Sequence, residues 1–458
     1  MNTNLSQRQL SLPGFSARQI PENRKVNSQQ NKLDSEDRHF HDWYRFVLSF
    51  PPHLVRNYID DFELSAKHTL LDPFCGTGTT LVESKLQGIK SVGLEINPFT
   101  QFASSVKVDW QIEPDTLEER AHDIAISALQ ILGSQGIDDT SLLGNIERIP
   151  LRTLTAEAEK LLLKNSISPL PLHKALVLLD CLKQHVYEPY DKYALLALAN
   201  ALVFSISNLY FGPEVGVGKP KHDVPVVASW LAEIRKITND LRTVAHQSYP
   251  DSTVFLADAR QISREVAPCS IDAVITSPPY PNEKDYTRTT RLESVMLGFI
   301  RNKTELQASK RRFLRSNTRG VYKGDDDDQW VADHPEIQRI ANTIEQRRIE
   351  LGKTSGFEKQ YGNVTRQYFG GMARHFADLR EILRPGAQLA YVVGDQASYL
   401  QVLIRTGELL AEIAQGLGYE LVRIDLFRTR LATVTKEQLR EEVVVLRWPG
   451  KVKNDCAR

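Results

Sequence analysis

The residues best suited to chemistry lie in the stretch 274–280, which reads Val-Ile-Thr-Ser-Pro-Pro-Tyr. Its apolar and β-branched start predicts a buried strand that ends abruptly at Ser277. Pro278 and Pro279 each fix φ and lack a backbone N–H, so the loop offers carbonyl acceptors without competing donors. The exocyclic amine of a nucleobase would fit these acceptors, and the ring of Tyr280 would provide a face for stacking. The alternative, a proline turn beside a core tyrosine, stays open on this stretch alone.

A second motif, at residues 69–80, reads Thr-Leu-Leu-Asp-Pro-Phe-Cys-Gly-Thr-Gly-Thr-Thr. A short apolar run leads into a Gly-x-Gly turn at Gly76 and Gly78, and a helical pattern follows. The chain then returns through a second strand at 89–95, which ends in Glu95. Strand, glycine turn, helix and strand with a terminal acid form a βαβ nucleotide-binding unit. The third glycine of the dinucleotide fingerprint and the Gly-Lys-Ser/Thr of a P-loop are both missing, so NAD and ATP are poor ligands for it.

Together the two motifs resemble those of the S-adenosylmethionine-dependent DNA amino-methyltransferases, a likeness that touches residues from about 40 to 448. The resemblance implies an α/β fold, with a Rossmann-like methyltransferase sheet, a terminal antiparallel hairpin and a largely helical insertion. It implies that S-adenosylmethionine is held by Asp72, Phe74, Cys75, Gly76, Gly78, Glu95, Asp258 and Ala259. It implies that the catalytic loop consists of Ser277, Pro278, Pro279 and Tyr280. Residues 41–54 resemble the helical element that closes over the cofactor in this family.

The first residue of the catalytic tetrapeptide bears on the product. In the family that the chain resembles, Asp or Asn at this position is typical of adenine-N6 enzymes, and Ser is typical of cytosine-N4 enzymes. The resemblance therefore implies, through Ser277, that the product is N4-methylcytosine. A target amine inside a duplex is out of reach, so the base is expected to flip out and stack on Tyr280. Adenine-N6 methylation of DNA is the alternative. An RNA amino-methyltransferase fits less well, because only about forty residues precede the closing element, too few for a separate RNA-binding domain.

A basic run at residues 301–320 follows the catalytic loop and carries seven basic residues against one acid, although the whole chain is balanced at 57 basic and 57 acidic residues. Its position favours phosphate contacts over a merely solvated helix face. The expected DNA-binding residues are Arg288, Arg291, Lys310, Arg311, Arg312, Arg315 and Arg319. The acidic run 325–328 is expected to be a surface turn. No metal site is expected, because the proposed chemistry needs none and the cysteines form no Cys-x-x-Cys pair.

The order of motifs predicts six segments along the chain. They are a polar mobile arm at 1–38, a cofactor-binding half at 39–114, a mainly helical insertion at 115–250, a catalytic half at 251–300, a basic insertion at 301–370 and the C-terminal part of the core sheet at 371–458. The helical insertion is a candidate target-recognition lobe. Within it, apolar spacing predicts a helix over 151–162, and glycines and prolines predict a loop at 211–222. Thr79 or Thr80 is expected to cap the helix after the glycine turn.

Double-stranded DNA is the expected partner, in the cytoplasm of a prokaryotic cell and in association with the nucleoid. No apolar run approaches membrane-spanning length and the first residues do not form a signal peptide, so no membrane partner is expected. The chain has no convincing nuclease motif. Any restriction endonuclease that acts on the same site would therefore be a separate protein, and the enzyme would serve in a restriction-modification system or as a solitary modification enzyme. The recognition sequence and the oligomeric state are not predicted.

Overall fold

The structure is a computed structural model that describes residues 35–45, 49–140, 150–184, 188–211, 215–282, 284–431 and 438–450. Its centre is a seven-stranded sheet in the order β5-β2-β1-β6-β7-β9-β8. The strands are β1 Thr69–Asp72, β2 Lys90–Glu95, β5 Ser252–Leu256, β6 Ile271–Thr276, β7 Leu383–Gly394, β8 Glu420–Leu431 and β9 Gln438–Arg447. Neighbours from β5 to β7 are parallel, whereas β9 is antiparallel to both β7 and β8. The predicted sheet with a terminal antiparallel hairpin is confirmed.

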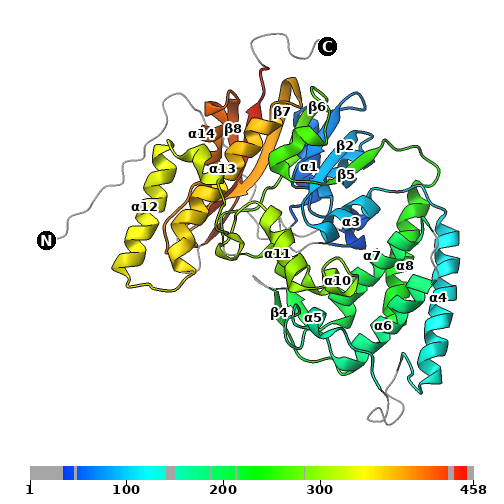
Figure 1. Cartoon of the computed structure of the whole chain (residues 1–458). Helices are drawn as coiled ribbons and strands as arrows, with labels where there is room; N and C mark the ends of the chain where they lie inside the picture. Colours follow the sequence, from blue (N-terminus) through cyan, green and yellow to red (C-terminus); the bar gives the residue numbers. More distant parts are fainter. Residues whose placement is uncertain are drawn as a thin grey trace.

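Helices cover both faces of the sheet, which explains why its strands read as nearly continuous apolar runs (Figure 1). Alternate strand residues point to opposite faces. Leu71, Val274 and Leu389 pack in one cluster with the helices α13 and α14, and Leu70 and Ala273 pack in another with α1. These core helices are α1 Pro52–Asp61, α2 Thr79–Leu86, α3 Pro98–Lys107, α13 Tyr361–Leu379 and α14 Thr406–Gly416.

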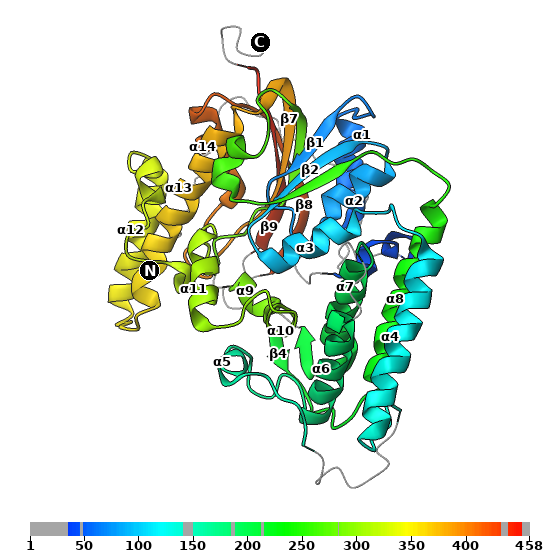
Figure 2. The ribbon, with the colours of Figure 1, turned by 45° about the vertical axis from the view of Figure 1, so that its right-hand side comes forward.

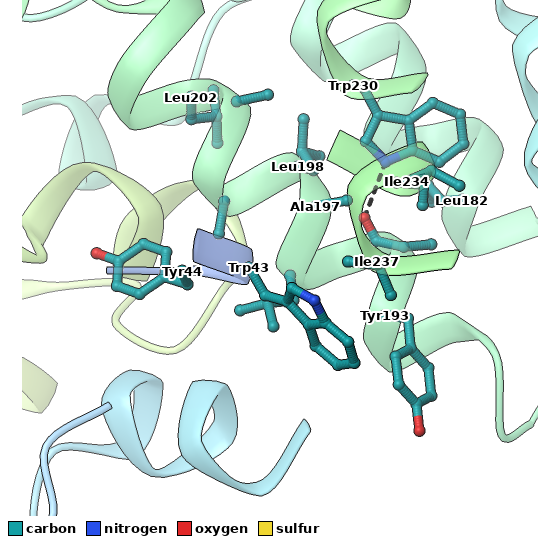
Figure 3. Close-up of a cluster of buried hydrophobic side chains, with 14 of the residues drawn as sticks. Trp43, Tyr44, Leu182, Tyr193, Ala197, Leu198, Leu202, Trp230, Ile234 and Ile237 are labelled. Atoms are coloured by element: carbon teal, nitrogen blue, oxygen red, sulfur yellow. Dashed lines mark hydrogen bonds between the residues drawn. The ribbon is translucent and has the colours of Figure 1, made fainter. Parts of the chain in front are cut away.

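The predicted helical insertion forms a lobe beside the cofactor half of the sheet (Figures 1 and 2). It contains α4 Pro114–Ser134, α5 Ala156–Glu159, α6 Pro169–Gln184, α7 Asp191–Ala201, a π-helical turn Leu202–Ile206, the hairpin β3 Leu209–Phe211 and β4 Val215–Val217, and α8 Val226–Val244. Trp43 and Tyr44 of the N-terminal segment lie among the buried side chains of this lobe (Figure 3). The same apolar cluster includes Leu81 and Phe99 of the core helices, so the lobe packs firmly against the sheet.

Two predictions about the insertion were wrong in part. The helix expected over 151–162 is reduced to the short α5, capped by Thr155, whose hydroxyl accepts from the Ala158 N–H at 3.2 Å. The loop expected at 211–222 contributes strands to the β3–β4 hairpin. In this hairpin the ring of Tyr210 lies over Gly216, where an added Cβ would come within 2.6 Å of the ring. The central part of that stretch and the arm at 1–34 lie outside the described residues.

Two helix starts also differ from expectation. The helix after the glycine turn is α2, and its N-cap is Gly78 in the left-handed region rather than a threonine, with no side-chain cap. The closing element expected as a helix over 41–54 forms only a 3-10 turn at His41–Trp43 before α1 begins at Pro52. Pro51 disfavours helical geometry in the residue before it, and Pro52 suits the first helical position. Residues 46–48 of this element lie outside the described residues.

The segment between β6 and α13 contains α9 Tyr286–Thr289, α10 Arg291–Met296, α11 Lys303–Arg312 and α12 Pro335–Glu350, with 3-10 turns between them. Its acidic run is not the surface turn that the sequence suggested. Asp327 is buried and pairs with Arg260, while Asp325 pairs with Arg315. The backbone of this run docks directly on α13 at Gly370, where a Cβ would overlap the Asp327 carbonyl oxygen. Charges that looked solvated therefore anchor the basic segment to the core.

Candidate active site

A cavity of about 770 Å³ opens at the carboxyl ends of β1, β2, β5 and β6, where ligands bind in open α/β sheets. It brings together residues from both sequence motifs. The predicted site residues that line it are Phe74, Cys75, Gly76, Glu95, Asp258, Ala259, Ser277, Pro278, Pro279, Tyr280, Lys310, Arg312 and Arg315. The predicted residues outside its lining are Asp72, Gly78, Arg288, Arg291, Arg311 and Arg319.

The catalytic loop follows β6 directly and is held from two sides. The Ser277 hydroxyl donates to the Val392 carbonyl on β7 at 3.2 Å, which leaves the lone pairs of its oxygen available. The ring of Tyr280 lies against Gly394, where an added Cβ would come within 3.2 Å of the ring. Burial raises the pKa of Tyr280, so its phenol stays neutral near pH 7. The loop therefore presents a hydroxyl oxygen and an aromatic ring at the cavity.

Asp72 lies beneath the cavity rather than in its wall. One carboxylate oxygen accepts from the Thr276 hydroxyl at 2.6 Å and from the Phe74 N–H at 3.1 Å. Its other oxygen is buried and has no hydrogen-bond partner among the described residues. Burial raises the pKa of Asp72 to about 6. Because Thr276 immediately precedes the catalytic loop, Asp72 links the two motifs at neighbouring strand ends.

Glu95 organises the glycine loop from the end of β2. Its carboxylate accepts from the Gly76 N–H at 2.9 Å and from the Asn97 N–H at 2.8 Å. A carboxylate has about four lone-pair sites, so a ligand donor can share it with these N–H groups. Burial raises the pKa of Glu95 to about 7. Around Gly76 no atom lies within 4 Å of the position that a Cβ would take, so a ligand can approach the backbone closely.

Asp258 does not face the cavity as an unpaired acid. Arg260 binds its carboxylate through the side chain at 2.7 Å and through the backbone N–H at 2.9 Å. The same guanidinium pairs with Asp327 and donates to the Arg312 carbonyl at 2.8 Å. Arg260 thus joins the end of β5 to the basic segment. An adenine amine could still donate to Asp258, because a carboxylate accepts several hydrogen bonds.

Sequence reasoning missed several residues that shape the cavity. The role of Asn97 as a helix cap could have been predicted, because Asn-Pro is typical of a helix N-cap and first turn. Its side-chain oxygen accepts from the Phe99 N–H. Arg428 and Glu441 of the β8–β9 hairpin line the cavity and pair with each other. Nothing in the sequence shows which face of a hairpin strand turns toward the cavity, because a shift of one residue reverses it.

Comparisons with known proteins agree with this geometry. The family model N6_N4_Mtase, described as DNA methylase, matches residues 15–103, a range that includes the glycine loop and Glu95. The chain is 26% identical to Type II methyltransferase M.BsoBI of Geobacillus stearothermophilus, over 93% of this chain and 87% of the relative. It is 23% identical to Type II methyltransferase M.AvaI of a Nostoc species, over 93% of this chain and 89% of the relative. These matches support membership of the DNA amino-methyltransferase family.

The crystal structure of TrmN from Thermus thermophilus aligns with this DNA amino-methyltransferase at a TM-score of 0.32 and 11% identity, covering 90% of this chain and 53% of that chain. The methyl donor of the enzyme is S-adenosylmethionine, as the family implies. The open approach at Gly76 and the carboxylate of Glu95 fit such a ligand. The volume of the cavity falls in the usual range for cofactor sites.

Two further findings concern only the described part of the chain. None of its helices is both long and apolar enough to cross a membrane. Nor do three or more His, Cys, Asp or Glu side chains come together there in a group that could hold a metal ion.

Affinity for the cofactor is expected to depend on pH through Glu95. Ribose hydroxyls would donate to the ionised carboxylate, and the ionised fraction of Glu95 rises as pH increases through its pKa of about 7. Binding of S-adenosylhomocysteine should therefore be about 10-fold tighter at pH 8 than at pH 6. Calorimetry across this range measures the effect. Glu95→Gln should bind more weakly and with a flat pH profile, whereas a flat profile in the native enzyme would contradict this role.

Proposed function

We propose that this DNA amino-methyltransferase transfers a methyl group to the exocyclic N4 of a flipped-out cytosine in double-stranded DNA, at a specific site. The observation that carries the proposal is Ser277, which stands first in the catalytic tetrapeptide and whose side chain lines the cavity. The relatives named Type II methyltransferases support a role as the modification enzyme of a restriction-modification system, with any endonuclease on a separate chain. A solitary modification enzyme would use the same site chemistry.

The catalytic loop would overcome the low nucleophilicity of the target amine, whose lone pair is delocalised into the ring. The Ser277 oxygen and the Pro278 carbonyl would each accept a hydrogen bond from the amine. Both acceptors would draw the nitrogen toward tetrahedral geometry and direct its lone pair at the incoming methyl group. Bound S-adenosylmethionine supplies an electrophilic methyl on a sulfonium. The rate gain then comes mainly from orientation and preorganised acceptors, not from a strong base.

Aromatic walls of the cavity would hold the base and keep water away. Tyr280 would stack on the flipped base, and its backbone N–H donates to the Tyr286 hydroxyl at 3.4 Å. Phe74 and Phe427 line the cavity on other sides. Stacking between a base and an aromatic side chain stabilises the bound state by about 1–3 kcal/mol. The geometry therefore suits a base held in a fixed plane beside the acceptors.

The structure divides six of the seven predicted DNA-binding residues into two groups, and the seventh, Arg288, is half-buried. Arg315 is 5% exposed and donates to the Asp325 carboxylate through Nε and Nη2. Lys310 pairs with Asp285 at 2.5 Å. Arg291 donates to the Thr287 and Leu161 carbonyls, so it joins α10 to the helical lobe. Such internal roles differ from the expectation that the whole set faces DNA. The exposed members of the basic run at 301–320 that were predicted to bind DNA are Arg311, Arg312 and Arg319.

We therefore expect phosphate contacts from the exposed group. Replacing Arg311, Arg312 and Arg319 together by alanine should weaken DNA binding on all sequences alike. The slope of log K against log salt should fall by about 0.9 for each lost contact. Fluorescence anisotropy over a salt series measures both quantities. Arg339→Ala serves as the control, because Arg339 is 65% exposed on α12 and pairs with Glu336. An unchanged slope would exclude this surface from the interface.

Modified-base sequencing of DNA from cells that express the protein tests the function as a whole. The expected result is N4-methylcytosine at one sequence motif and its absence in cells that carry an empty vector. N6-methyladenine at a single motif would replace the cytosine proposal by the adenine alternative. Unmodified DNA together with methylated RNA would overturn both.

A further inference from the structure

The turn between α12 and α13 exposes large apolar side chains. Ile349, Leu351 and Phe357 are 62%, 52% and 54% exposed within nine residues of chain. Exposed apolar groups gathered in this way mark interaction surfaces more often than single ones do. In both ribbon views the turn lies at the lower left, on the side of the molecule away from the helical lobe (Figures 1 and 2).

Phe357 is the member of this group that is tied to the active-site cavity. The guanidinium of Arg319 lies over its ring, 5.9 Å from the centroid. Gly320, the next residue along the chain, lines the cavity. The contact with Arg319 thus places Phe357 near the cavity, and the exposed guanidinium of Arg319 lies beside its ring.

A second set of contacts fixes the position of the segment that carries Phe357. Tyr361 stacks on Tyr399 with ring centroids 4.8 Å apart. The Tyr399 hydroxyl donates to the Ser316 carbonyl at 3.0 Å, and Ser316 lines the cavity. The start of α13, which follows Phe357 closely in the chain, is therefore anchored to the cavity wall.

We propose that Phe357 is a positioning residue that contacts the base stack of the DNA duplex and stabilises the state in which the target base is flipped out. This inference rests on the proposed function. A base that leaves the helix exposes the faces of its neighbours, and an apolar ring can cover them. Arg319 would hold the adjacent phosphate, which gives the surface the charge that DNA requires. Phe357 acts through the DNA and does not touch the reacting amine.

The test compares two duplexes that contain the motif found by sequencing. In one the target base is correctly paired, and in the other it is mispaired, so that flipping is easier. Phe357→Ala should methylate the paired duplex about 10-fold more slowly and the mispaired duplex at nearly the native rate. Val422→Ala, which removes a comparably exposed apolar side chain from β8 outside the cavity lining and the apolar turn, should leave both rates unchanged. An equal loss on both duplexes, or no loss on either, would overturn the proposal.

A second measurement does not depend on methyl transfer. With 2-aminopurine at the target position, fluorescence rises when the base leaves the stack, and S-adenosylhomocysteine can occupy the cofactor site during the measurement. The native enzyme should increase the signal and Phe357→Ala should reduce that increase several-fold. Failure of the proposed function would show as fluorescence enhancement without methylation of either duplex. Equal enhancement by the native enzyme and the variant would refute the role of Phe357 even then.

Discussion

Ser277→Ala is expected to lower kcat for methyl transfer by about 100-fold, the size seen when one preorganised polar group is removed from an active site. The hydroxyl lines the cavity and already donates to the Val392 carbonyl, so its oxygen is oriented to accept from the target amine. Alanine removes this acceptor and leaves the rest of the loop in place. Incorporation of a labelled methyl group into DNA measures the rate. Calorimetry with S-adenosylhomocysteine should show nearly native cofactor binding.

The matched control is Ser398→Ala, which removes another hydroxyl from the wall of the same cavity. It should retain most of the activity, because Ser398 lies outside the catalytic tetrapeptide. Near-native turnover by Ser277→Ala would take the hydroxyl out of the mechanism. If both variants lost activity equally, a general disturbance of the cavity would explain the result better than a missing acceptor.

Gly78→Val is expected to weaken binding of S-adenosylhomocysteine by at least about 100-fold. Gly78 has a φ of 84°, where a β-branched residue is strongly disfavoured. A Cβ there would also lie 2.5 Å from the Ser104 hydroxyl oxygen, so the glycine loop must move. Such a shift displaces Gly76 and its contact with Glu95. Calorimetry measures the affinity, and the melting temperature shows whether the variant remains folded.

Gly88→Ala is the control for backbone strain alone. Its φ is 72°, but no atom lies within 4 Å of the added Cβ. This variant should lose some stability and keep its affinity for S-adenosylhomocysteine. Gly78→Ala provides a milder change should valine prevent folding. A folded variant at Gly78 that binds S-adenosylhomocysteine as well as the native enzyme does would show that this loop is not the cofactor site.

The sequence predicts the central sheet well because its signals are local. The strand predicted to end at Ser277 is β6, Ile271–Thr276, and the strands predicted at the start of the motif 69–80 and at 89–95 match β1 and β2 closely. A buried strand reads as an apolar run that ends at a turn. Ligand-binding loops follow the carboxyl ends of such strands in α/β sheets. Once the strands are placed, both motifs fall at one edge of the sheet.

Charged residues were harder to interpret, because their role depends on partners far away in the chain. Arg315 and Arg312 belong to one basic run, yet Arg315 is buried against Asp325 and Arg312 is exposed. Arg260 joins residues 258 and 327, a pairing that no periodicity in the sequence indicates. A buried charge is stable only when it is paired, and the pair exists only after the chain has folded.

The sequence by itself therefore determined the α/β sheet, the glycine loop and the acceptor-rich loop, since covalent geometry and short apolar runs specify them. Only the tertiary structure decided that Asp72 lies below the cavity and bonds to Thr276, 204 residues away. It alone showed which arginines reach solvent and that Phe357 lies beside Arg319. The physical reason is that burial and electrostatic pairing depend on distances in space, whereas the sequence records only order along the chain.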